Sequence, residues 1–236
     1  MSVDIVSVPL GVFGLAIALF RLLRRDRFSS MNLTILAFAL GTGLLVRSPW
    51  LGDTVLDGSI GEAVGWWNVP DLVGHLATFT AMAAALAYFV RAVGYHAPLW
   101  SSYMILGIFA AVCVVTYAGA PARHVQSDNM VQLDGMEAYS AVFSGALLIT
   151  HAFGLFIARH GRREAGWRPE IIAMLVGTIA GIIMAVHRLL VLASPSAGDY
   201  LYDLVTWTTS LLCIGGYLAA AYLVSVPRRS RQVQCG

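Results

Sequence analysis

Ionisable side chains occur inside or at the ends of long apolar stretches of this chain, and their types and spacing could support chemistry. Asp71 and His75 are four residues apart, which places both on one face of a helix. His187 and Arg188 are adjacent in a later apolar stretch. Charged groups in an apolar environment are costly, so they are candidates for binding or proton transfer. The candidate ligand or proton site consists of Arg47, Asp71, His75, His187, Arg188 and Asp203.

Three interpretations of this polar layer remain open. Arg188 is always charged and needs a carboxylate or water when it is buried. Asp71 and Asp203 are the carboxylates expected at its depth, and we expect an Arg188–Asp71 pair. The layer is then an ion-pair network that holds the helix ends together, or a polar pocket that a small solute or proton reaches. Helix ends that lie shallower and are simply hydrated are the third interpretation.

Metal or enzymatic chemistry has less support in the sequence. Asp71, His75 and His187 are weak candidates for metal ligands, and the two histidines could face each other across a haem. The metal site lacks a third histidine at that depth, and no second pair of facing histidines supports a haem, so we expect no metal and no cofactor. The motifs G-x-S-x-G and H-E-x-x-H do not occur, and the sequence has no lysine for Schiff-base chemistry. No catalytic residue is assigned, and an enzyme is not the expected function.

The composition explains why these residues have apolar neighbours. Of the 236 residues, 58% are hydrophobic and 12% are charged, and the mean hydropathy is +0.74. A soluble domain carries about 25% charged residues, so this chain lacks the charge to cover a water-facing surface. The composition excludes a soluble globular protein, a disordered chain and a nucleic-acid binder. We expect an all-α, polytopic integral membrane bundle whose first partner is the lipid bilayer.

A helix that crosses a bilayer needs about 20 apolar residues, and the chain contains seven such stretches. The expected transmembrane helices are 5–23, 31–50, 70–90, 98–118, 137–158, 170–193 and 201–225. They form one transmembrane domain over residues 1–226, and 227–236 is a short basic tail. The segment 51–69 could add a short helix on the outer surface.

The arginines predict the orientation of the chain. All 15 basic residues are arginine, and 12 of them follow the first, third and fifth spans or lie in the tail. Positive charge is retained on the cytoplasmic side of membrane proteins. We therefore expect the N-terminus outside and the C-terminus in the cytoplasm.

Small and weakly polar residues inside the spans are expected to pack helices together. His151 lies deeper than the polar layer, and we expect it to hydrogen-bond to a neighbouring helix. Cys113 and Cys213 are expected to be inert packing residues, with neither a disulfide nor a zinc site. The glycines expected at close helix contacts are Gly41, Gly43, Gly177, Gly181, Gly215 and Gly216.

Three segments together resemble a known family: LLVRSPW, NVPDLVGHLATF and MAVHRLLVL. They are similar to actinobacterial, phage and prophage seven-helix membrane proteins that are labelled transporters and contain a domain of unknown function. The resemblance covers residues 31–225 and implies a location in the bacterial inner membrane. It marks Arg47, His75, His187 and Arg188 as family-like positions. Asp71 departs from the pattern, because Asn is more usual there.

Three functions follow as hypotheses. A transporter-like or small-solute-binding bundle would use the outer polar layer. A membrane sensor or immunity-type signalling protein would act through the basic inner loops, whose arginines could also contact anionic lipid. A membrane-embedded metal-dependent enzyme would use the weak metal candidates. A small-molecule solute and a second copy of the chain in a homo-oligomer are the partners left open beside the bilayer, whereas the substrate and the direction of transport are not predicted.

Overall fold

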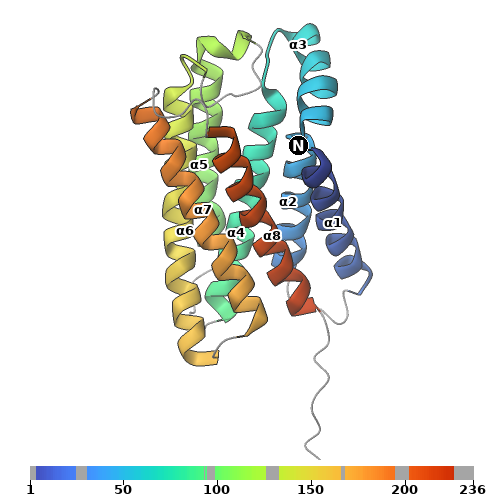
Figure 1. The fold of residues 1–236 in the computed structure, drawn as a ribbon, viewed down its shortest axis with the longest axis vertical. Coiled ribbons are helices and arrows are strands. Elements are labelled where there is room, and N and C mark those ends of the chain that lie inside the picture. The colour runs from blue at the N-terminus through green and yellow to red at the C-terminus, as the bar shows by residue number, and fades with distance from the viewer. Residues whose placement is uncertain are drawn as a thin grey trace, which may run out of the picture.

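The computed structural model describes residues 4–24, 31–92, 94, 99–125, 133–165, 168–194 and 202–225. The described residues form a bundle of long helices without a strand, which confirms the all-α prediction (Figure 1). The long helices are α1 (Asp4–Leu23), α2 (Met31–Val46), α4 (Val69–Ala92), α5 (Leu99–Gly119), α6 (Glu137–Ala165), α7 (Pro169–Ala193) and α8 (Tyr202–Ser225). The tail 227–236 lies outside the described residues.

The helices correspond to the seven predicted apolar stretches. Six of those in the described residues are long and apolar enough to cross a membrane, namely all except α2. α2 is long and apolar enough only together with the segment that follows it. If this bent pair is counted as one span, the described residues contain seven candidate spans. Each long helix packs against the next along the chain, and α8 returns to contact α1 and α2, so the bundle is closed.

α2 stops at Val46, four residues before the end of the predicted span 31–50. Pro49 cannot donate a backbone hydrogen bond and disfavours a helical residue before it. Ser48 is accordingly extended, and its side chain accepts a hydrogen bond from the amide of Leu51. The turn also needs Gly52, because a Cβ there would lie 2.3 Å from the carbonyl oxygen of Val46.

After this break the chain turns by 66° and continues as a π-helix, Pro49–Asp57, and the short helix α3, Gly58–Val64. In Figure 1 this helical segment rises above α2 toward the upper end of the bundle. The short helix predicted within 51–69 is therefore present.

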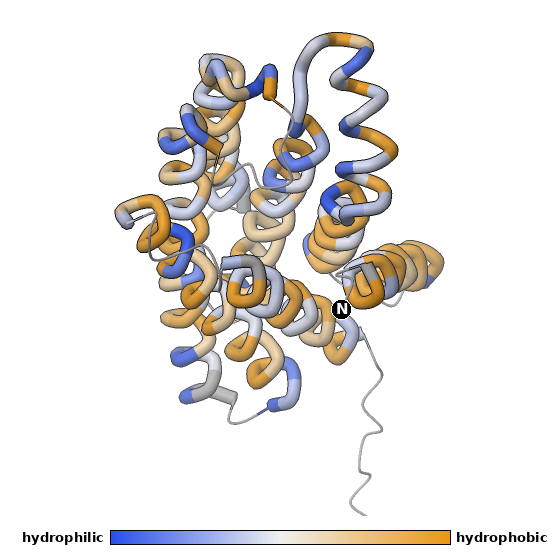
Figure 2. The backbone as a smooth tube through the Cα atoms, turned by 45° about the horizontal axis from the view of Figure 1, so that its top comes forward, coloured by the Kyte–Doolittle hydropathy of each residue, from blue (hydrophilic) through white to orange (hydrophobic). Residues whose placement is uncertain are grey.

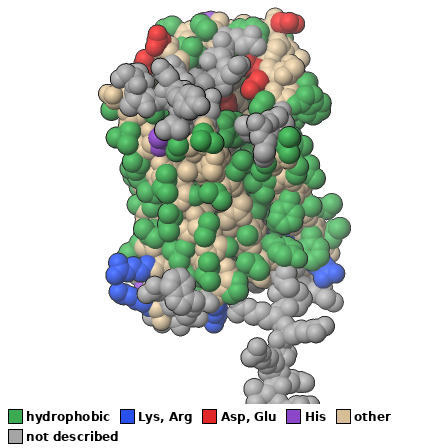
Figure 3. Space-filling view, in the orientation of Figure 1, with side chains coloured by type: hydrophobic (Ala, Val, Ile, Leu, Met, Phe, Trp, Pro, Cys, Tyr) green, Lys and Arg blue, Asp and Glu red, His purple; other side chains and the backbone are tan. Residues whose placement is uncertain are grey.

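The sides of the bundle are apolar and its two ends are charged. Figure 2 shows hydrophobic residues along the long helices, and Figure 3 shows one side covered mainly by hydrophobic side chains. In the same view, arginines gather at the lower end and acidic side chains at the upper end. Exposed arginines where α4 and α6 finish and α7 begins are Arg91, Arg159, Arg163 and Arg168. Exposed acidic residues at the opposite end are Glu62, Asp134 and Glu137.

Close helix contacts depend on glycine, as predicted at five of six positions. A Cβ on Gly41 of α2 would lie 2.8 Å from the carbonyl oxygen of Gly11 in α1. A Cβ on Gly216 of α8 would lie 2.6 Å from the amide nitrogen of Gly177 in α7. The other confirmed positions are Gly43, Gly177 and Gly181. The prediction is wrong for Gly215, where a Cβ would meet no atom within 4 Å.

Gly215 and Gly216 form a matched pair for testing the α7–α8 contact. We expect Gly216→Ala to lower the free energy of unfolding by about 1–3 kcal/mol, because the helix backbones would have to separate. Gly215→Ala should leave it unchanged or raise it by about 0.5–1 kcal/mol, because alanine favours the helix. Equilibrium unfolding of both purified variants measures the difference. Equal effects at the two positions would contradict the close contact.

Candidate functional site

Arg47 and Asp71 form an ion pair at the end of the bundle near α3. Arg47 follows the last residue of α2, and its Nε donates a hydrogen bond of 2.9 Å to Oδ1 of Asp71 in the first turn of α4. The arginine side chain crosses α4 at Gly74, where a Cβ would lie 2.2 Å from its Cγ and Cδ atoms. The predicted pair of Asp71 with Arg188 is therefore wrong, because Arg47 occupies the carboxylate.

The start of α4 is fixed by hydrogen bonds to the segment after α5. Asn68 has a φ of 63°, a conformation that Asn tolerates better than most residues, and its side-chain amide donates to the carbonyl of Val125. The backbone amide of the neighbouring Trp67 donates a hydrogen bond to the carbonyl of Arg123, and the carbonyl of Trp67 accepts one from the hydroxyl of Tyr117. These contacts hold the first turn of α4, and hence Asp71, in place.

His75 faces away from the ion pair and toward α6. The side chain is 1% exposed, and its Nδ1 shares a hydrogen bond of 2.5 Å with the hydroxyl of Tyr139. Its ring stacks on Phe143 with a centroid distance of 3.7 Å. The other ring nitrogen, Nε2, is buried and has no hydrogen-bond partner. One turn of α4 thus presents Asp71 to α2 and His75 to α6.

Arg188 is a buried cation near the end of α7. The side chain is 2% exposed, and its Nε has no hydrogen-bond partner. Among the described residues no carboxylate lies within 4.0 Å of its guanidinium. Its Cζ instead lies 5.0 Å from the centroid of Phe143, a cation–π contact. Phe143 therefore contacts both His75 and Arg188, which are joined through this ring rather than through Asp71.

His187 does not join this group. Its ring packs at 5.6 Å from that of Tyr202 at the start of α8, and its Nδ1 is buried without a partner. Asp203 follows Tyr202 in α8, but its side chain lies outside the described part of the chain. The weak metal candidates Asp71, His75 and His187 are not assembled: the described residues contain no group of three or more His, Cys, Asp or Glu that could hold a metal ion.

A small cavity of about 30 Å³ lies among the five helices α2, α4, α6, α7 and α8. Arg47, Arg188 and His151 all line it, so the deeper histidine meets two members of the polar layer, contrary to our expectation. The remaining polar lining residues are Thr78, Ser210 and Cys213, and no carboxylate of the described residues lines the cavity. A space of this size holds about one or two water molecules.

His151 is bonded to a neighbouring helix, as predicted. Its Nδ1 lies 3.2 Å from the hydroxyl of Tyr217 in α8, which also bonds Thr178 of α7 at 3.0 Å. The Nε2 atom lies 3.7 Å from the Sγ of Cys213, and a Cβ on Gly181 would overlap the imidazole ring. Cys213 is thus a buried packing residue that also orients the histidine. The contact joins α6, α7 and α8.

Sequence reasoning missed three residues of these networks. Tyr139, Phe143, Leu147 and His151 follow one another on α6 at intervals of four residues, so this stripe of period four was the available signal. Arg21 was read as an orientation signal alone, yet it is buried. It donates to the hydroxyls of Thr34 and Ser225, which joins α1 to α2 and α8.

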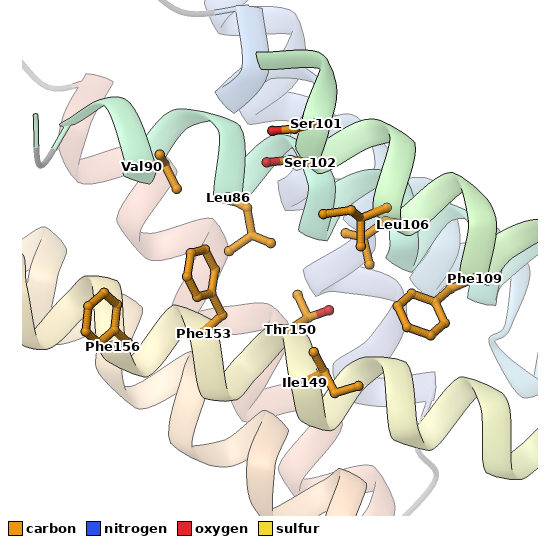
Figure 4. Close-up of a pocket in the computed structure, with 11 residues that line it drawn as sticks. Leu86, Val90, Ser101, Ser102, Leu106, Phe109, Ile149, Thr150, Phe153 and Phe156 are labelled. Atoms are coloured by element: carbon orange, nitrogen blue, oxygen red, sulfur yellow. The ribbon is translucent and has the colours of Figure 1, made fainter. Parts of the chain in front are cut away.

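A larger hollow lies elsewhere, on the side of the bundle. A groove of about 820 Å³ runs between α4, α5 and α6 and is lined mostly by apolar side chains (Figure 4). Ser101, Ser102 and Thr150 are its polar lining residues, and no charged side chain lines it. It lacks the convergent polar groups of a solute site. The cavity at Arg188 is therefore the candidate site.

Comparison of the chain with protein-family models, with curated proteins and with solved structures finds no match. The candidate site therefore rests on its own geometry.

The pairing of Arg47 with Asp71 can be tested by a double-mutant cycle. Arg47→Gln and Asp71→Asn should each reduce the free energy of unfolding, with a coupling of about 1–2 kcal/mol for a half-buried pair. The matched cycle of Arg188→Gln with Asp71→Asn should give less than about 0.5 kcal/mol. Unfolding of the single and double variants supplies both values. A larger coupling to Arg188 than to Arg47 would reverse the assignment.

Proposed function

We propose that this chain is an integral membrane protein that binds a small solute in the cavity beside Arg188. The supporting observation is the state of that arginine: a guanidinium that is 2% exposed, faces a cavity and has no carboxylate partner among the described residues. A buried charge without a partner is destabilising. Such groups are retained where they have a function, so ionisable residues inside membrane bundles are candidates for binding sites.

The membrane assignment is supported by the surface of the bundle. Helices long enough to cross a bilayer present large apolar side chains on their outer faces, for example Leu190, Val115 and Ile108. A soluble monomer rarely exposes so extensive an apolar surface to water, whereas in a bilayer the same side chains would contact apolar lipid tails.

The orientation is supported by the separation of charge between the ends. Exposed arginines gather at the end where α4 and α6 finish, and exposed acidic residues at the other. By the positive-inside rule, the arginine end faces the cytoplasm of a bacterial cell. The polar layer with Arg47 and Arg188 then lies toward the outer side, where an external solute would arrive. The resemblance to seven-helix proteins labelled transporters agrees with a transporter-like function.

Cysteine labelling tests the topology. In a Cys235→Ser background, Glu62→Cys and Arg163→Cys place single reporters at exposed positions on opposite ends of the bundle. We expect a membrane-impermeant maleimide to label position 62 in intact cells and position 163 only after the membrane is opened. The buried Cys113 and Cys213 provide the unreactive background. Labelling of both reporters from outside would exclude this topology.

Thermal stability in detergent tests solute binding. Sodium chloride, choline, glycine and glucose represent an anion, a cation, a zwitterion and a neutral solute. We expect at least one to raise the Tm in a saturable way, because a ligand that binds the folded state stabilises it. Arg188→Gln should weaken that binding about tenfold or more, as expected for a lost hydrogen bond to a charged group.

Arg163→Gln is the control, because it removes an exposed arginine at the opposite end of the bundle. It should bind as the wild type does. If no solute of any charge shifts the Tm, or if both arginine variants behave alike, the cavity is not a solute site.

A further inference from the structure

We infer that the ligand of this cavity is a small inorganic anion of halide size, held by the guanidinium of Arg188. The inference rests on the proposed solute site and specifies its chemistry. Three observations carry it: the charge around the cavity, the availability of Arg188 as a donor, and the volume of the space.

The charge around the cavity selects for an anion. Two arginines line it and no carboxylate does. Arg47 is neutralised by Asp71, which lies outside the lining, whereas Arg188 has no carboxylate within 4.0 Å among the described residues. Among the described residues, the guanidinium of Arg188 therefore has no directly paired counter-charge, and in an apolar bundle its field is weakly screened. A cation would be repelled, and a neutral solute would leave the charge uncompensated.

Arg188 is also the donor that the surrounding residues leave available. Thr78 donates its hydroxyl to the carbonyl of Gly74, and Ser210 donates to the Sδ of Met184 at 2.8 Å. Both ring nitrogens of His151 have partners in α8. The guanidinium, by contrast, has a buried Nε without a hydrogen-bond partner among the described residues, and its Cζ lies over the ring of Phe143. An anion in the cavity would receive the missing N–H donors.

The volume limits the anion. About 30 Å³ accommodates one or two water molecules, so a monatomic halide fits without rearrangement. Sites for organic ligands occupy about 300–1,000 Å³, and an organic carboxylate or a nucleotide would require the helices to separate. The large groove between α4, α5 and α6 has that volume but no charged lining residue. Of these two hollows, only the cavity beside Arg188 combines a positively charged lining with the volume of a small anion.

The test replaces sodium gluconate by sodium bromide at constant ionic strength, with the full chain in detergent. Bromide is the probe, and gluconate is an anion too large for the cavity. We expect a saturable rise in Tm of about 3–6 °C once bromide exceeds its Kd about tenfold. Arg188→Gln should abolish the rise. Arg163→Gln should keep it, because Arg163 is an exposed arginine at the opposite end of the bundle.

Two further measurements keep the result decisive if Arg188→Gln does not fold. Ser210→Leu should abolish the bromide response by filling the cavity while Arg188 stays in place. Anomalous scattering from wild-type crystals grown in bromide should place the ion beside the guanidinium of Arg188. Failure of both to implicate the cavity would overturn the inference.

Other outcomes separate this inference from the proposed function. Arg188-dependent binding of choline, glycine or glucose without a bromide effect would retain the solute site and reject the anion. A bromide response that appears only in Asp203→Asn would identify Asp203 as the counter-charge of Arg188 and also reject a bound anion. An equal response to bromide and gluconate would show a general salt effect and overturn the anion site.

Discussion

The compensation of arginine charge inside an apolar bundle is the constraint on which the rest of this structure depends. The charge of each of three arginines has a different environment. Arg21 donates to hydroxyls on α2 and α8, and Arg47 forms an ion pair with Asp71. Arg188 has an aromatic ring and a cavity, but no carboxylate within reach among the described residues. Our proposal places the binding site at Arg188, because it is the arginine of these three without a hydrogen-bonding or carboxylate partner among the described residues.

The close helix contacts and the polar contacts are arranged by the same glycines. Gly74 lets α2 approach α4 and also provides the space through which Arg47 reaches Asp71. Gly181 lets the imidazole of His151 lie directly against α7. In both places the missing side chain of one residue gives room to the polar side chain of another. Substitution of either glycine would therefore disturb packing and charge compensation together, which is why glycine occurs beside the site.

Phe143 connects two members of the polar layer, His75 and Arg188. Its ring stacks on His75 from α4 and lies under the guanidinium of Arg188 from α7. Because the ring also lines the cavity, a ligand that moves Arg188 would alter the contact of His75 as well. The hydrogen bond between His75 and Tyr139 anchors the far side of this arrangement. The tertiary structure thus joins His75 and Arg188 through an aromatic side chain, without the carboxylate that the sequence suggested.

The sequence by itself determined the helices and the identity of the charged candidates. Apolar stretches of about 20 residues specify long helices because each helix satisfies its own backbone hydrogen bonds. The bounds of α4, α5, α7 and α8 lie within two residues of the prediction, whereas α6 continues to Ala165, seven residues past the predicted end of its span. Sequence also identified His151 as a contact between helices and five of the six packing glycines. It misjudged the end of α2, where Pro49 and Ser48 break the helix earlier than hydropathy alone suggested.

Only the tertiary structure decided which charges meet. Spacing along a helix fixes the face on which a residue lies, but the rotation and crossing of neighbouring helices fix its partner. Those depend on the contacts of Gly43 with Gly74 and of Gly177 with Gly216, summed over the whole bundle. A rotation of one residue moves a side chain by about 100° around its helix. That is why Asp71 meets Arg47, whereas Arg188 is left facing a cavity.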